Sequence, residues 1–276
     1  MEKEVGESQP RRSRFFTQPL SRTASFQPNL PAHHLGSERL PDGSSRARRR
    51  AFHESDSPVL PHLILTAATI LRVDLGHHLG KCLPAVVGAG VFTGHVDRGA
   101  VDFSLDTFVL TPSDRSSSLF TWLDRVLSDG RATVCVYDLI DVIAALDTLP
   151  DAGRSSALRR LRGYGSQQVI DSVSCGPDPT SISFVDAART AGIPCTVPDP
   201  DIAFEAWMTG RQAVLVDKLA TDAIASWRFT MNGIADRSAI GHRVNAAIER
   251  HLIEWLRHQG TPATALHLHS LARTKR

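Results

Sequence analysis

The sequence has no large excess of either charge and few cysteines. Lys and Arg number 31 against 29 Asp and Glu, so the formal net charge is +2. This balance excludes a chain that is basic throughout, as a nucleic-acid coat protein is, and an acidic disordered chain. The four cysteines, at positions 82, 135, 175 and 195, show no Cys-x-x-Cys spacing. A disulfide framework and a zinc knuckle are therefore not expected, and a cytoplasmic protein is favoured.

Long apolar runs are also missing. The longest apolar stretches, such as Leu63–Ile70 and Ala85–Val91, are far shorter than the roughly 20 residues of a membrane-spanning helix. The first residues, Met-Glu-Lys-Glu-Val, are polar and lack the apolar region of a secretory signal. We therefore expect no membrane segment and no secretion signal.

The common catalytic signatures are absent. There is no Gly-x-Ser-x-Gly elbow, no Walker phosphate-binding loop and no complete Gly-x-Gly-x-x-Gly. Gly88-Ala89-Gly90 lies within a pattern typical of a strand, so we interpret it as a site of tight packing. The paired histidines, His77-His78 and His267-Leu268-His269, lack the Glu of a metalloprotease helix. We interpret them as surface or tail residues.

What the sequence does contain is an uneven distribution of charge. Residues 1–50 hold nine Arg and one Lys against five acids, a net charge of +5, which leaves −3 for the other 226 residues. This first part is rich in Ser, Pro and Arg and shows no apolar period, which predicts a disordered basic tail over residues 1–55. Its cluster at 46–50 suits a solvated tail, a targeting tag or a nucleic-acid contact. We expect an α/β domain over 56–260 and a short C-terminal tail over 261–276.

The patterns after residue 58 predict a mixed α/β domain whose second half is mostly helical. Apolar, β-branched or alternating runs predict strands over 84–93, 101–110 and 132–137, and 62–73 suits a strand or a short helix. Helical spacing predicts helices over 117–128, 139–149, 201–209, 212–231 and 236–259, and a further helix that begins at Thr180 or Ser181 and ends at Ala191.

Aspartates at the edges of apolar elements are the candidates for chemistry. Asp138 and Asp141 directly follow the predicted strand 132–137, where a carboxylate is held rigidly and can face a cleft. Asp222 lies inside a predicted helix beside apolar residues, and a carboxylate in such a place needs a partner or a cation. For each of the three, a solvated carboxylate or a helix cap is the alternative interpretation.

The order of segments in the second half resembles a known family. Ala191-Gly192-Ile193-Pro194, Gly210-Arg211, Asp222 and Trp227-Arg228-Phe229 follow one another. In this order they resemble the predicted 3′–5′ exonucleases related to the proofreading domain of family B DNA polymerases. The segment Lys81–Ala89 also resembles the strand after the first motif of that family. The resemblance covers about residues 80–255 and implies a ribonuclease H-like fold, with a mixed sheet flanked by helices and four catalytic acids.

The motifs of this family are degenerate here. The first one is Asp-x-Glu-Thr, and its nearest counterpart, Phe52-His53-Glu54-Ser55, keeps only Glu54; Asp74 is the alternative acid. Asp141 takes the place of the second acid, with Asp138 as its substitute, and Asp222 is the last. The family has a Tyr four residues, or a His five residues, before the last Asp, and this sequence has Lys218 and Asp217 there.

The resemblance implies hydrolysis with two divalent ions, which converging carboxylates hold about 3.5–4 Å apart. It assigns Glu54, Asp141 and Asp222 as catalytic acids, all three and Asp138 as ligands of Mg²⁺ or Mn²⁺, and single-stranded DNA ends as substrate. Lys218 suits a phosphate contact or a solvated position. Because the first Asp and the Tyr or His are missing, we expect slow turnover or none.

Two classes of function are open at this point. The first is a metal-dependent 3′–5′ exonuclease or its inactive descendant. The second is a non-catalytic module on the same fold, which binds nucleic acid or uses its helical half to bind protein. Convergence of Asp141 and Asp222 with a third acid favours the enzyme, and placement on different faces favours the interaction module.

Overall fold

A computed structural model describes residues 62–76, 79–97, 99–163, 168–176, 183–237 and 239–274. The chain divides into two units, Met1–Phe52 and His53–Arg276, and all described residues belong to the second. The predicted basic tail and Glu54 lie outside the described residues, as do Thr180 and Ser181.

The centre of the described fold is one mixed sheet in the order β3-β2-β1-β4-β5. The strands β1, β2 and β3 pair antiparallel, whereas β4 pairs parallel with β1 and with β5. Their bounds are Leu63–Asp74, Pro84–Asp97, Ala100–Val109, Thr133–Val136 and Val169–Asp171. The predicted α/β class with a mixed sheet is therefore confirmed. The segment 62–73, for which a strand and a helix were both open, is a strand because it pairs with β2 along its whole length.

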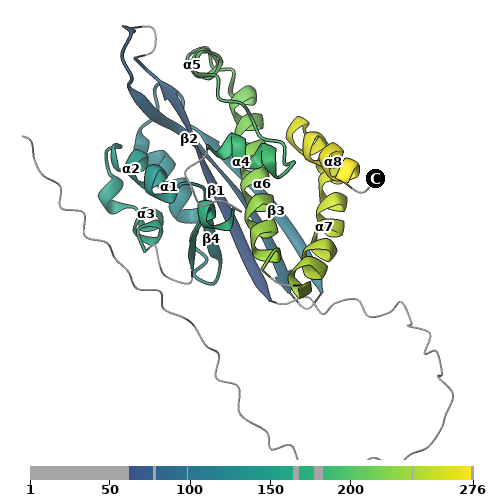
Figure 1. Ribbon diagram of the computed structural model, residues 1–276. Coiled ribbons are helices and arrows are strands. Elements are labelled where there is room, and N and C mark those ends of the chain that lie inside the picture. Colours follow the sequence, from purple (N-terminus) through teal and green to yellow (C-terminus); the bar gives the residue numbers. More distant parts are fainter. Residues whose placement is uncertain are drawn as a thin grey trace, which may run out of the picture. The chain divides into compact units, whose positions relative to one another are not determined.

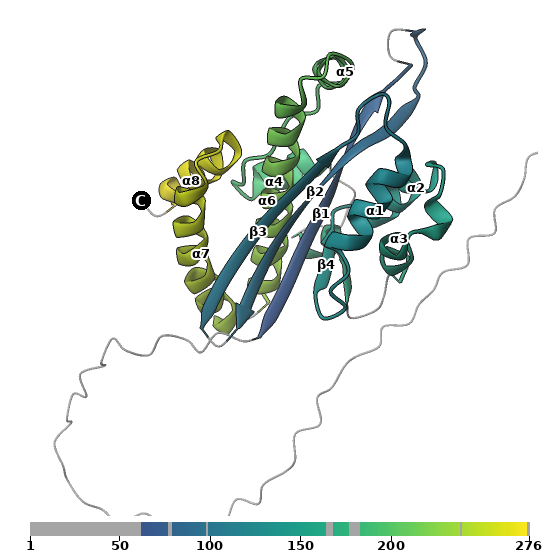
Figure 2. The same ribbon diagram turned by 180° about the vertical axis from the view of Figure 1, so that it is seen from behind.

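Helices cover both faces of the sheet (Figures 1 and 2). One face carries α1 (Ser116–Val126), α2 (Leu139–Asp147) and α3 (Ser156–Leu161). The other carries α6 (Gln212–Ala235), α7 (Ala239–Gln259) and α8 (Pro262–Thr274). Successive side chains of β1 point to opposite faces, so Ala67 packs in the α6 side of the core and Ala68 in the α1 side. The helical C-terminal half is confirmed.

The shorter elements connect these layers. They are the 3₁₀ turns η2 (Ala152–Arg154) and η3 (Ser172–Cys175) and the helices α4 (Phe184–Thr190) and α5 (Pro200–Met208). Ser183 begins α4, since its side chain accepts a hydrogen bond from the backbone N–H of Asp186. Helix α4 thus begins after the positions 180 and 181 that its sequence pattern suggested.

The Gly-Ala-Gly segment lies where α6 crosses β2. A Cβ atom on Gly90 would lie 2.9 Å from the backbone oxygen of Leu219, and one on Gly88 would lie 2.7 Å from the backbone oxygen of Phe108. The two glycines therefore permit close approach of backbones, and the interpretation as a packing site is confirmed.

The predicted end of the long helix at residue 231 is wrong. Helix α6 continues through Asn232 and Gly233 to Ala235. Gly233 lies in close contact with η3, since a Cβ on it would lie 2.3 Å from the backbone oxygen of Cys175. A glycine inside a helix can therefore mark close packing as well as a helix end.

Helix α8 extends the fold beyond residue 260. Residues 262–274, assigned to a short tail from the sequence, form this helix, and Ala263, His267 and Leu271 are buried at a spacing of four. His267 is therefore a core residue, contrary to the surface or tail position expected for it. Within the described residues, no helix is long and apolar enough to cross a membrane.

Candidate functional site

Three of the four predicted ligand acids line one cleft of about 370 Å³. Strand β4 pairs with β1 only over Leu65–Ala67, so β1 continues beyond the end of β4. The segment Ala68–Arg72 of β1 lines the cleft, α2 and α6 supply the acids Asp138, Asp141 and Asp222, and Ser183 and Thr196 complete its wall. The structure thus brings together the acids that follow β4 and the acid of the long helix.

Asp138 and Asp141 lie at the start of α2. Asp138 adopts a left-handed backbone conformation (φ 54°, ψ 62°), and its side chain accepts a hydrogen bond of 3.3 Å from the backbone N–H of Asp141. This is the capping interaction of a helix N-terminus. The alternative interpretation of Asp138 as a cap is therefore correct, and its Oδ1 is engaged in that cap.

Asp141 is paired with a cation from the sheet. The Arg72 Nη2 lies 2.6 Å from Asp141 Oδ2 and also donates to the backbone oxygen of Asp141 at 3.0 Å. Arg72 belongs to the strand β1. The β1 residues that line the cleft are Ala68, Thr69, Ile70, Leu71 and Arg72, so this strand contributes a guanidinium and no carboxylate.

Asp222 is held by hydrogen bonds to both of its oxygens. Oδ1 accepts from the backbone N–H of Thr196 at 2.8 Å, and Oδ2 accepts from the Thr196 hydroxyl at 2.7 Å. The Lys218 ammonium lies 3.7 Å from Oδ2 and donates to the same hydroxyl. The Asp222 side chain is only 15% exposed. Burial raises its pKa above the ordinary value, while Lys218 and the hydrogen bonds from Thr196 act to lower it.

Asp74, the alternative first-motif acid, does not contribute to the cleft. Asp74 lies at the end of β1, where its Oδ1 accepts from the backbone N–H groups of Gly76 and Leu83 at 2.9 and 2.8 Å. It stabilises the β1–β2 turn and does not line the cleft, so it cannot replace the first-motif acid there. Glu54 lies outside the described residues, and its assignment stays a prediction.

The donor set of the cleft does not fit a two-metal centre. In the part of the chain that the structure describes, no three His, Cys, Asp or Glu residues lie close enough to hold a metal ion. Two divalent ions require several open carboxylates, whereas Asp138 caps a helix and Asp141 and Asp222 each lie beside a cation. Asp141 and Asp222 share the cleft with Asp138, but no three such residues in this part lie close enough to hold an ion, so the arrangement that would favour the enzyme is met only in part.

The sequence analysis did not identify the residues that pair or hydrogen-bond with these carboxylates. Arg72 had a visible signal, since it is the one charged residue between the apolar stretch 63–71 and Val73. Thr196 had none, because it lies in an irregular segment 26 positions before Asp222. Neither a scan of protein-family models nor a search of curated proteins finds a match to the chain.

Proposed function

We propose that this protein is a ribonuclease H-like relative of the 3′–5′ exonucleases that acts as a non-catalytic binding module. The observation that carries the proposal is the pairing in the cleft, where cations of the chain itself lie beside the two acids that would bind metal. The mixed sheet, with its antiparallel opening strands and flanking helices, supports the ribonuclease H-like assignment.

The physical argument concerns the competition between resident cations and divalent ions. A partly buried carboxylate needs a compensating charge, and here Arg72 and Lys218 supply it. A metal ion would have to displace both side chains from the carboxylates and lose part of its own hydration shell. Among the described residues, β1 also brings no carboxylate to the cleft that could bridge two ions. We therefore expect no assembled two-metal site and no hydrolysis through one.

Metal-dependent hydrolysis of nucleic-acid ends with Mg²⁺ or Mn²⁺ is the competing function. It is supported by the family resemblance and by the shared cleft of Asp141 and Asp222. Single-stranded DNA ends would be its substrate. The cleft offers two cations against three carboxylates, which disfavours a phosphate backbone because that backbone binds through excess positive charge.

All four cysteines are free thiols, in keeping with the cytoplasmic location that we propose.

The expected result is that millimolar Mg²⁺ or Mn²⁺ neither raises the melting temperature nor supports cleavage of 3′-labelled single-stranded DNA or RNA. The matched variant is Asp222→Asn, which should behave like the wild type in both assays. Cleavage by the wild type that Asp222→Asn abolishes would establish the exonuclease instead. A metal-dependent rise in melting temperature that the variant loses would likewise show that the carboxylates bind the ion.

An apolar groove favours protein as the partner of the module. Four exposed aliphatic side chains converge on a groove of about 420 Å³ formed by the segment after α4 and by α5, α6 and α8; they are Val197, Ile202, Val214 and Leu266. Isolated exposed aliphatic residues are common, but a gathered set marks an interaction site. Asp217 lines the same groove and has no side-chain partner among the described residues. An apolar peptide segment with a basic residue complements both features.

A synthetic amphipathic helix of Leu and Lys is the probe for this groove, and the same peptide with Glu in place of Lys is its control. We expect saturable binding of the Leu/Lys peptide only, measured by fluorescence anisotropy. Leu266→Asp should weaken it about tenfold or more, as loss of a central apolar anchor does. Leu79→Asp, which changes a leucine that is 72% exposed and outside the groove, should leave binding unchanged. Equal binding of the Leu/Glu peptide, or full binding by Leu266→Asp, would contradict this assignment.

A further inference from the structure

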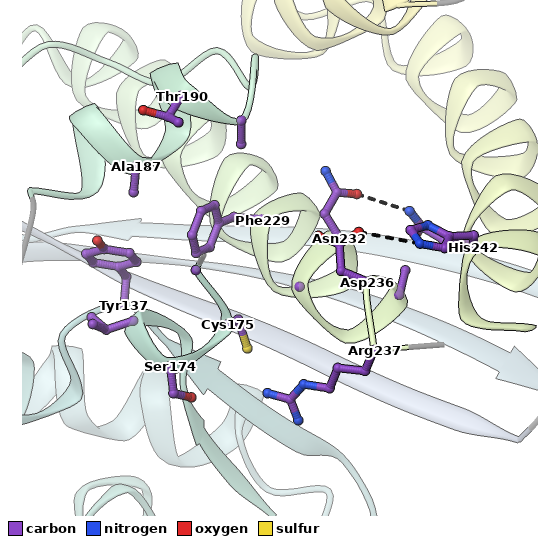
Figure 3. A pocket seen from close by; sticks show the side chains of 16 residues that line it. Tyr137, Ser174, Cys175, Ala187, Thr190, Phe229, Asn232, Asp236, Arg237 and His242 are labelled. Carbon is purple, nitrogen blue, oxygen red and sulfur yellow. Dashed lines mark hydrogen bonds and ion pairs between the residues drawn. The ribbon is translucent and has the colours of Figure 1, made fainter. Parts of the chain in front are cut away.

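A second pocket lies at the C-terminal end of α6 (Figure 3). It has a volume of about 690 Å³ and is enclosed by η3, α4, the last turns of α6 and the first turns of α7. This volume is within the range of small-molecule sites, roughly 300–1,000 Å³. Tyr137 lines both this pocket and the cleft, but the three cleft acids do not reach it.

The wall that η3 forms is rigidly held. The Ser172 and Thr230 hydroxyls are 2.7 Å apart in a buried hydrogen bond, and Asp171 Oδ1 accepts from the backbone N–H of Val173 at 3.0 Å. Cys175 rests directly on Gly233, where no Cβ would fit. Binding to a pocket with preformed walls loses little conformational entropy.

Two carboxamides present a donor and an acceptor to the pocket. The Asn245 Nδ2 donates to Asn232 Oδ1 at 3.0 Å, which leaves the Nδ2 of Asn232 and the Oδ1 of Asn245 without another partner in the described residues. In Figure 3 the free nitrogen of Asn232 points away from His242, on the α4 side of the helix. Both asparagines are half-buried. A carboxamide donor and a carboxamide acceptor are the groups with which asparagine side chains bind the edge of adenine.

The pocket also combines an apolar wall with a cation. Tyr137 and Phe229 meet edge to face with ring centroids 5.7 Å apart, and Ala187 continues this wall. Arg237 points into the opposite side, toward Ser174 (Figure 3), and pairs with no acid among the residues described. The Oδ1 of the nearby Asp236 lies 3.8 Å from the Nε2 of His242. An aromatic, apolar wall suits the ring of a base, and the exposed guanidinium of Arg237 suits a phosphate.

We propose that this pocket binds a purine nucleoside monophosphate unit, either free or at the end of a strand. The base lies against Tyr137 and Phe229 with its edge at Asn232 and Asn245, and the phosphate pairs with Arg237. This site shares only Tyr137 with the cleft and no residue with the apolar groove, and it uses none of the cleft acids, so it is tested separately from the proposed function.

The experiment is titration calorimetry of the full chain with AMP, GMP, UMP and a short 5′-phosphorylated oligoadenylate. We expect AMP to bind saturably and more tightly than UMP. Arg237→Gln should lower the affinity for AMP about tenfold or more, as the loss of a charged hydrogen bond does. Asn232→Asp, which keeps the acceptor for Asn245 and removes the free donor, should weaken it similarly. Arg243→Gln, an exposed α7 residue outside the pocket, is the matched control.

The outcomes separate the two sources of the ligand. Binding of AMP that Arg237→Gln weakens identifies a free nucleotide, and binding of the oligoadenylate alone with the same sensitivity identifies a strand end. Unchanged melting temperatures for Arg237→Gln and Asn232→Asp show that the fold is intact. The proposal is overturned if neither ligand binds, if UMP binds as tightly as AMP, or if Arg243→Gln weakens binding as much as Arg237→Gln does.

Discussion

Replacement of Trp227 by alanine is expected to lower the free energy of unfolding by about 3–5 kcal/mol. The indole is 2% exposed at the centre of the α6 side of the core. It meets Phe92 and Phe103 edge to face, with ring centroids 5.5 and 5.6 Å apart. Its Nε1–H donates to the backbone oxygen of Leu65 at 3.0 Å. The alanine variant therefore leaves a large cavity and also a buried carbonyl without its donor.

Urea unfolding followed by circular dichroism measures this effect without relying on tryptophan fluorescence. Trp255→Ala is the matched control: its ring also contacts Phe92, with centroids 5.3 Å apart, but it is only partly buried. Trp255→Ala should therefore lower the free energy of unfolding by clearly less than Trp227→Ala does. A loss below about 1 kcal/mol for Trp227→Ala would show that α6 does not anchor the sheet.

The stability of the protein is expected to fall steeply below pH 6.5 because of one buried histidine. His267 is fully buried, and its Nε2 lies 2.9 Å from the backbone oxygen of Thr221, while its Nδ1 lies 3.1 Å from the Arg228 Nη1. Since Arg228 can only donate, Nδ1 must accept and the ring must be neutral. Burial, and then the Arg228 cation, lower the pKa of His267 from 6.5 to about 3.

The direction of this pH dependence of stability follows from proton linkage. At pH values between about 3 and 6.5 the unfolded chain binds a proton at this histidine and the folded chain does not, so acid favours unfolding. The contribution of His267 is fully present above pH 6.5 and is lost progressively toward pH 3. The whole loss between these pH values is on the order of 5 kcal/mol.

The measurement is the free energy of unfolding of the wild type and of His267→Gln at several pH values from 7.5 to 4. Glutamine retains an N–H donor for Thr221 and does not titrate in this range. The difference between the two proteins removes the contribution of the carboxylates, which titrate in both. We expect the wild type to lose stability with falling pH faster than the variant. Parallel pH dependences would show that His267 titrates normally.

Much of the fold was visible in local patterns. Apolar, β-branched and alternating runs predicted the strands β2 and β3, and helical spacing predicted α1, α2 and the first five turns of α6. The elements that were missed are short or carry weak patterns: β5 has three residues and α3 has six. Helix α8 was missed because its buried set includes a histidine and a threonine, which the polarity pattern counts as surface residues.

By itself, the sequence determined the α/β class and the acids that gather in the cleft. Asp138 and Asp141 follow β4 and Asp222 lies within α6, so their positions depend on local structure. Only the tertiary structure decided what those acids do. Arg72 and Thr196 reach Asp141 and Asp222 across separations of 69 and 26 residues, and no local pattern encodes a contact between distant segments. The partner of a buried charge is therefore decided when the sheet and α6 pack together.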